Sequence, residues 1–220
     1  MRTKKLIMAA VVILSLAVLL ASCGSSSSGG GPDTDSCPNW NLGDSTMYKR
    51  TVTVSGVPTE TTMTYVVTER TTDSVTLSDG TTTKKYSIVA GRYIPLSEEV
   101  SLQPADNYTS TTAFCPPPAV GEIYEYTTFV PGPDPRSGDN ITTTLSVTGV
   151  TIESVSVPAG SFTAKKLVME KISLMGTTPW LISTVTRYYV GGIGVVKEVE
   201  EIPSENTTIT DELTSYSFQQ

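Results

Sequence analysis

The stretch ETTMTYVVTERTTDSVTLSDGTTTKKYSIV, residues 60–89, aligns without a gap on NITTTLSVTGVTIESVSVPAGSFTAKKLVM, residues 140–169. The offset is 80 residues, and Gly80 meets Gly160 within a turn signal of each segment. Upstream, GDSTMY (43–48) matches GEIYEY (121–126) at an offset of 78. The difference falls in the loop PGPDPRSGD, where insertions cost little free energy. The sequence therefore predicts two copies of one β-rich unit of about 80 residues, at 37–115 and 116–220.

Segments such as TYVVTE (64–69), EYTTFV (125–130) and LISTVTRYYV (181–190) are rich in β-branched and aromatic residues, as β-strands are. Gly, Pro and Asp recur in short breaks between them, in turn roles. We expect an all-β fold, an antiparallel meander that forms a half-barrel, a barrel or a sandwich. The two copies could form two modules or one body, and we favour one body because a small sheet exposes a face that a partner half would cover.

The first 22 residues have the layout of a secretory signal. MRTKK (1–5) carries three positive charges, and LIMAAVVILSLAVLL (6–20) carries no charge, so an N-terminal signal helix is expected. Leu20-Ala21-Ser22-Cys23 resembles the lipobox of bacterial lipoproteins. The resemblance implies cleavage before Cys23, a diacylglyceryl thioether on its sulfur and an acylated (palmitate-type) amino group. An ordinary secretory signal and an uncleaved anchor are the alternatives, although the apolar run is short for a span of about 20 residues.

Residues 23–36 follow as a lipidated cysteine and a tether, because the low-complexity GSSSSGGG (24–31) cannot bury a core. Two or three acyl chains hold a protein on a membrane far better than one. By analogy with lipoproteins, Gly24 in place of the inner-membrane Asp signal favours the periplasmic face of the outer membrane. The expected partners are the membrane, through the lipid, and an envelope protein or an apolar ligand.

Composition excludes some partners and predicts a disulfide. Removal of residues 1–22, which hold three basic and no acidic residues, changes the formal net charge from −7 to −10. An acidic body of this kind argues against nucleic acid as a partner. Cys37 and Cys115 remain after lipidation of Cys23, and in an oxidising compartment two cysteines predict one disulfide, with two separate buried thiols as the alternative.

VPAGSFTAKKLVM (157–169) followed by TRYYVGGIGVVKEVE (186–200) resembles a pattern of uncharacterised bacterial envelope lipoproteins. The pattern runs V-P-A-G-x-F-x-A, then a strand, then Y-Y-x-x-G-x-G-x-V-K. The resemblance implies a β-rich half-barrel, distantly similar to the lipoprotein carriers of the outer-membrane localisation pathway. The long helices that fill those carriers have no counterpart in this sequence.

The sequence offers little for catalysis, and no cofactor or metal is expected. It has no histidine, which removes Ser-His-Asp and Cys-His mechanisms and histidine-based zinc sites. Ser161 and Lys165 are too far apart on a strand for a dyad. Two carboxylates could hydrolyse a glycosidic bond, but nothing in the sequence pairs the candidate acids, which are Glu98, Glu99, Glu198, Glu200 and Glu201. Asp134, Asp139 and Asn140 lack the spacing of a calcium loop.

The remaining candidates for a site are aromatic. A concave groove could be lined by Trp40, Tyr124, Tyr126, Trp180, Tyr188 and Tyr189, although aromatic residues in antiparallel sheets more often pack in the core. We therefore expect a non-enzymatic envelope lipoprotein that acts as a binding or assembly module. The alternatives are a carrier of an apolar or lipid ligand, which requires a cavity of several hundred Å³, and a carboxylate-dependent hydrolase, which requires two acids that converge in a cleft.

Overall fold

The computed structural model describes residues 34–89, 91–100, 106–107, 115, 117, 119–131, 138–175 and 177–218, with backbone alone at 94–100, 106–107, 124–131, 138–141 and 180. The chain divides into two compact units, Met1–Pro32 and Asp33–Gln220, and every described residue belongs to the second. The predicted signal segment, Cys23 and the tether up to residue 33 lie outside the described residues. Within the described ranges, no helix has the length and apolar composition to cross a membrane.

Strands make up most of the second unit, which confirms the predicted all-β class. The strands are β1 Ser45–Val54, β2 Val57–Arg70, β3 Ser74–Ser78, β4 Thr82–Val89, β5 Arg92–Val100, β6 Asp106–Asn107, β7 Ile123–Pro131, β8 Gly138–Val157, β9 Gly160–Met175, β10 Thr178–Val190, β11 Gly194–Ile202 and β12 Thr207–Ser217. A single 3₁₀ turn, η1 Pro203–Glu205, links β11 to β12 in the described part of the chain.

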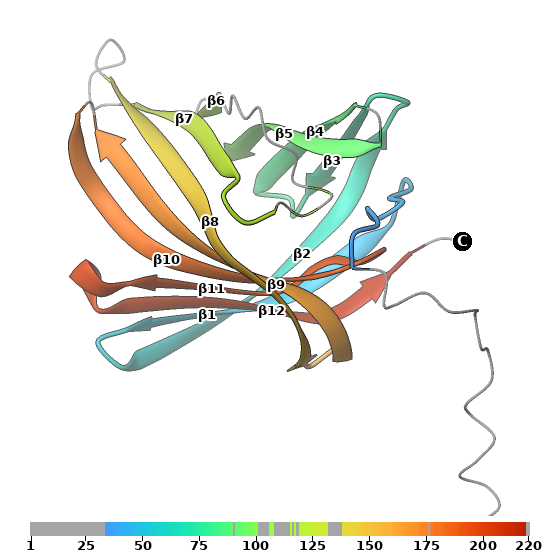
Figure 1. The fold of residues 1–220 in the computed structure, drawn as a ribbon. Coiled ribbons are helices and arrows are strands. Elements are labelled where there is room, and N and C mark those ends of the chain that lie inside the picture. Colours follow the sequence, from blue (N-terminus) through green and yellow to red (C-terminus); the bar gives the residue numbers. More distant parts are fainter. Residues whose placement is uncertain are drawn as a thin grey trace, which may run out of the picture. The chain divides into compact units, whose positions relative to one another are not determined.

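The described strands form one sheet in the order β6-β5-β4-β3-β2-β1-β12-β11-β10-β9-β8-β7. Every neighbouring pair is antiparallel. β1 to β6 thus form one half of the sheet and β7 to β12 the other, and the halves meet where β1 pairs with β12. The sheet curves into a half-barrel (Figure 1), the first of the predicted architectures.

The first hairpin of each half has the same register. Ser45 of β1 pairs with Val66 of β2, and Ile123 of β7 pairs with Ser146 of β8. Ser45 and Ile123 are 78 residues apart, and Val66 and Ser146 are 80 residues apart. These are the two offsets of the sequence alignment. A bulge follows in both halves, after Val67 and after Val147.

The halves differ after this bulge. β2 ends at Arg70, and the Thr71 hydroxyl accepts a hydrogen bond from the Ser74 amide at 3.0 Å while it donates to Asp73 at 2.8 Å, which closes a turn. β8 instead continues to Val157 as one strand of 20 residues. The aligned residues Thr151-Ile152-Glu153 have no Asp to hold such a turn, and β-branched Ile152 favours an extended backbone.

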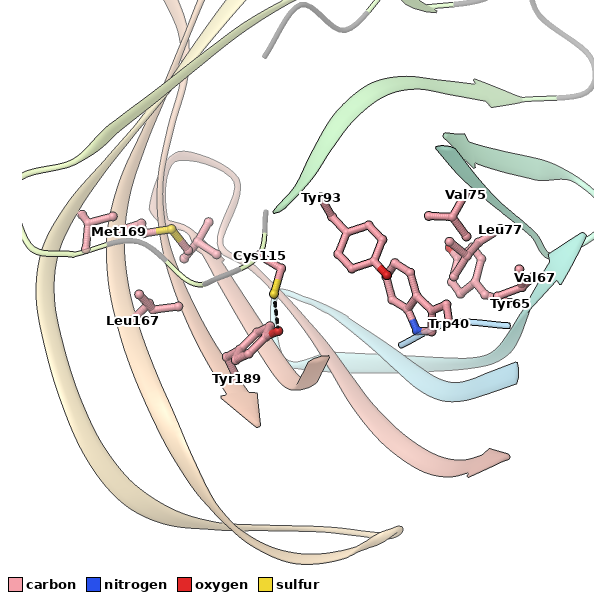
Figure 2. Close-up of a cluster of buried hydrophobic side chains, with 12 residues drawn as sticks. Trp40, Tyr65, Val67, Val75, Leu77, Tyr93, Cys115, Leu167, Met169 and Tyr189 are labelled. Atoms are coloured by element: carbon pink, nitrogen blue, oxygen red, sulfur yellow. Dashed lines mark hydrogen bonds between the residues drawn. The ribbon is translucent and has the colours of Figure 1, made fainter. Parts of the chain in front are cut away.

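The main hydrophobic core lies inside the curve of the sheet. Its buried members come from both halves and from the segments that precede β1 and β7, and they are Trp40, Tyr65, Val67, Val75, Leu77, Tyr93, Cys115, Val147, Leu167, Met169, Val185 and Tyr189. Figure 2 shows Trp40 beside Tyr93, and Tyr189 against Cys115. Leu167 and Met169 alternate along β9 and point to one face, as expected from their spacing.

A second, smaller cluster forms where the β8–β9 hairpin meets β11 and β12. Val155, Ala164, Val196 and Leu213 are buried there. The backbone amide of Ala159, at the tip of the hairpin, donates to the Leu213 carbonyl at 3.0 Å. The tip matches the predicted Pro158-Ala159-Gly160 turn, and Gly160 has a φ of 140°.

Candidate functional site

A pocket of about 160 Å³ lies on the concave face of the sheet. Its walls come from strands of both halves that are distant in the sheet order, β3 and β4 on one side and β10 and β11 on the other, which only the curvature can bring together. The lining residues are Trp40, Thr46, Tyr48, Arg50, Met63, Tyr65, Leu77, Lys84, Tyr86, Arg187, Ile193, Gly194, Val195, Glu198 and Asp211.

Strand periodicity explains which residues line the pocket. Thr46, Tyr48 and Arg50 are two residues apart on β1, so their side chains point to the same face. The same spacing brings Met63 and Tyr65 of β2 to that face. The β10–β11 hairpin adds Val195, whose carbonyl accepts a hydrogen bond from the Tyr48 hydroxyl at 2.8 Å.

Four charged side chains form a row across neighbouring strands of the pocket. Asp211 of β12 lies opposite Arg50 on one side and Glu198 on the other. Glu198 of β11 in turn lies opposite Arg187 of β10. Two carboxylates on adjacent strands repel each other, so the arginine on either side of the pair is what stabilises the row.

Both carboxylates are held by guanidinium groups. Arg50 donates from Nε and Nη2 to the two oxygens of Asp211, at 2.8 and 2.7 Å. Arg187 Nε donates to Glu198 at 2.5 Å. A two-point guanidinium–carboxylate contact fixes the plane of both groups, so the polar wall of the pocket is preorganised.

The pKa of Glu198 reflects two opposing effects. Burial favours the neutral acid, but the positive charge of Arg187 and its hydrogen bond outweigh burial, and Lys84 and Lys171 add to them. The pKa of Glu198 is therefore below its ordinary value, and the group stays ionised at neutral pH. Burial also raises the pKa of Tyr48, which keeps its hydroxyl a neutral hydrogen-bond donor.

Aromatic rings form the opposite wall. The Trp40 ring lies 5.8 Å from the Tyr86 ring and 5.0 Å from the Tyr93 ring. The Lys84 ammonium lies 4.8 Å from the centroid of the Tyr65 ring, within range of a cation–π interaction. The indole N–H of Trp40 is buried and has no hydrogen-bond partner among the described residues.

A disulfide joins Cys37 and Cys115 in the main core, as predicted, with a Cα–Cα distance of 5.5 Å. The two cysteines are 78 residues apart. The bond therefore joins the segment that leads into the first half of the sheet, before β1, to the segment that leads into the second half, before β7. The Tyr189 hydroxyl lies 2.8 Å from Cys115 Sγ and donates to the Ser36 carbonyl at 3.0 Å. Ser36 also accepts from the Gly192 amide at 3.0 Å, so this segment is tied to the sheet.

The structure describes the side chains of three of the six aromatic residues of the predicted groove. Trp40 lines the pocket, Tyr189 is buried in the main core, and Tyr188 packs against the second cluster. Tyr124 and Tyr126 lie on β7 and Trp180 on β10, and their side chains lie outside the description.

The other catalytic candidates have structural partners. Ser161 shares a hydrogen bond with Ser156 at 2.9 Å, and Lys165 pairs with Asp35 at 2.7 Å, so they do not form a dyad. Glu200 accepts from Lys171 at 2.9 Å.

The last acids of the prediction are only partly described. Glu98 and Glu99 lie on β5, and Asp139 and Asn140 on β8, with backbone alone, while Asp134 falls outside the described residues. Glu201 is exposed on β11. No three His, Cys, Asp or Glu side chains of the described part approach closely enough to hold a metal ion.

Sequence reasoning missed Arg50, Arg187 and Asp211. Their positions in the sequence indicate that they face inward. A charged residue that is two positions from an apolar residue in a strand points to the same, buried face. Arg50 follows Tyr48 in this way, and Arg187 precedes Tyr189. The pairing of β1 with β12, which brings Arg50 to Asp211 across 161 residues, has no local signal.

No protein-family model and no curated protein sequence matches the chain. Among solved structures, a candidate exported protein with a YmcC-like fold from Bacteroides fragilis has a TM-score of 0.46 and 13% identity, over 84% of this chain and 99% of that one. A candidate lipoprotein from Parabacteroides distasonis has a TM-score of 0.41 and 9% identity, over 84% and 100%.

The hypothetical lipoprotein YmcC from Escherichia coli has a TM-score of 0.42 and 12% identity, over 78% of this chain and 87% of that one. With TM-scores below 0.5, these three likenesses carry no inference about the function of the chain.

Proposed function

We propose that the chain is a lipid-anchored envelope protein that binds a small polar ligand in the concave pocket and performs no catalysis. The anchor rests on the sequence, where an apolar run, two small residues and Cys23 follow one another in the lipobox order. The same argument, with Gly24 after the cysteine, favours the periplasmic face of the outer membrane.

One observation carries the binding role, the row of Arg50, Asp211, Glu198 and Arg187 beside an aromatic wall. Ligand sites combine apolar and aromatic surface with a few polar groups that are fixed in orientation. The guanidinium contacts fix the polar groups of this pocket, and the rings of Trp40, Tyr65 and Tyr86 supply aromatic surface.

The pocket selects a ligand by size and charge. A volume of about 160 Å³ is small beside the roughly 300–1,000 Å³ of typical ligand pockets, which favours one small ring or a short polar chain. Three cationic side chains face two carboxylates, which favours a neutral or singly anionic molecule. An acyl chain needs a larger and more apolar cavity, so this pocket gives less support to a carrier of lipids.

The state of the two acids argues against a hydrolase. A glycosidase needs one carboxyl group whose pKa is raised, so that it can donate a proton. Glu198 has a lowered pKa, and Asp211 is held at both oxygens by Arg50. Glu198 is thus held ionised and Asp211 is fixed in orientation, which suits recognition of a ligand.

Native mass spectrometry of the acylated protein, purified gently from membranes, tests the binding role. Met63→Trp fills the pocket, and Thr62→Trp adds the same ring to the exposed face of β2 as a control. The proposal predicts a small molecule of defined mass on the wild-type and Thr62→Trp proteins and its loss from a folded Met63→Trp protein. Equal occupancy in all three would place the molecule elsewhere, and a stoichiometric protein in place of a small molecule would favour an assembly role.

A further inference from the structure

One end of the half-barrel gathers the turns that precede β1 and β7. Neighbouring strands are antiparallel throughout the sheet, so all odd-numbered strands begin at the same end. The turns at 41–44 and 119–122 therefore lie at that end, together with the β10–β11 turn at 191–193.

Apolar side chains project from this end. Leu42 and Val120 are each 60% exposed and hold the same place in their turns, directly before Gly43 and Gly121. Both glycines have a φ of 87°. Ile123 at the start of β7, Val89 at the end of β4 and Tyr216 at the end of β12 are also exposed there. Leu42, Val89, Val120, Ile123 and Tyr216 define the apolar end.

The described chain also begins at the apolar end. The Ser36 carbonyl accepts from the Gly192 amide in the β10–β11 turn, and Asp35 pairs with Lys165. Ten residues, 24–33, connect Cys23 to Thr34, and ten residues span at most about 36 Å even when fully extended. The ten residues of β1 alone span about 33 Å.

This length favours contact of the nearer end with a membrane. The opposite end also exposes apolar side chains, Val54 and Val57 among them, so exposure alone does not choose between the ends. A bilayer at the opposite end would require residues 24–33 to run fully extended along the whole sheet. A bilayer at the apolar end requires no such extension.

We propose that the apolar end docks on the bilayer surface, with Leu42 and Val120 inserted at the level of the headgroups. This inference rests on the lipid anchor of the proposed function. Charged side chains of both signs lie at this end and bond to groups of the protein: Asp73 to Thr71, Glu122 to the Ala119 amide, and Lys165 to Asp35. The partner is therefore a zwitterionic surface, bound by apolar insertion rather than by charge.

Hydrogen–deuterium exchange of the acylated protein in phosphatidylcholine vesicles tests the docking. Peptides that cover 41–44 and 119–122 should exchange roughly threefold or more slowly than in the unacylated Cys23→Ser chain in solution. Peptides that cover 54–57 should not change. The double variant Leu42→Ser/Val120→Ser should lose the protection, and the matched control Val54→Ser/Val57→Ser should keep it.

A second arm separates this proposal from the anchor. In this arm the chain begins at residue 24 and carries an N-terminal oligohistidine, which attaches it to vesicles with a nickel-chelating lipid. The turns at 41–44 and 119–122 should show the same protection as in the acylated protein. This result does not depend on acylation of Cys23, because the chain lacks that residue. Equal exchange at both ends in the two arms, or protection that survives Leu42→Ser/Val120→Ser, would overturn the docking. A failed acylation with protected turns in the second arm would overturn only the anchor.

Discussion

Val67 and Val147 occupy equivalent places in the two halves of the sheet. The Val67 carbonyl accepts from the Gly43 amide at 2.9 Å, and the Val147 carbonyl accepts from the Gly121 amide at 3.0 Å. Each valine amide donates in return to the backbone carbonyl of the residue after that glycine. The Val67 amide donates to Asp44 at 2.8 Å, and the Val147 amide donates to Glu122 at 3.0 Å. The same pair of backbone hydrogen bonds therefore sets the register of the first hairpin in each half of the sheet.

Gly121→Ala should lower the free energy of unfolding by about 1–2 kcal/mol, because a φ of 87° is unfavourable for a residue with a Cβ. An added Cβ would meet nothing within 4 Å, so the cost is conformational alone. Gly149→Ala is the control, with an ordinary φ and a Cβ 3.7 Å from Val168. Urea unfolding measures both, and equal stability of the two variants would contradict the argument.

Much of this frame could be predicted from the sequence. Alternation gave the strands, glycines marked the turns at Gly80, Gly160 and Gly192, and two remaining cysteines predicted one disulfide. The sequence did not predict that β8 runs unbroken where β2 turns back, because the difference depends on whether Asp73 or Glu153 stands two residues after the aligned threonine. Nor did it predict the charged row, since Arg50 and Asp211 meet only through the pairing of the first and last strands.

Removal of the disulfide by Cys37→Ser/Cys115→Ser should cost about 2–4 kcal/mol in the free energy of unfolding, since the bond closes a long loop. Thiol titration provides an independent check. The acylated wild-type protein should show no free thiol before reduction and two after it, in denaturant. Two reactive thiols without reductant would contradict the bridge.

Tyr189→Phe should destabilise the fold by about 1 kcal/mol, because a fully buried hydroxyl loses its bond to the Ser36 carbonyl and its contact with Cys115. Tyr216→Phe is the matched control, since that ring is 42% exposed. Thermal unfolding followed by circular dichroism compares the two. A larger loss for Tyr216→Phe would argue against the role of Tyr189 in fixing the N-terminal segment.

Stability should decline with acid in a way that depends on Glu198. Its folded pKa lies below the ordinary 4.5, so the ionised group stabilises the fold fully above that pH, and the stabilisation is lost as the pH falls through the folded pKa. Glu198→Gln should reduce stability at neutral pH by about 1–2 kcal/mol and flatten the decline at acid pH. Urea unfolding at a series of pH values from 7 down to 3 measures the free energy of unfolding of both proteins. If this free energy fell with pH in parallel for the wild type and Glu198→Gln, the result would count against the Glu198–Arg187 pair.

The binding and docking roles that we propose both depend on a lipid at Cys23 that would keep the pocket and the apolar end beside a membrane. Fractionation and intact mass of the wild-type and Cys23→Ser proteins test it most directly. We predict that the wild type pellets with membranes and has the mass of residues 23–220 plus its acyl groups, while Cys23→Ser loses the acyl mass and leaves the membrane fraction. An unchanged distribution and an unmodified mass in both would contradict the account.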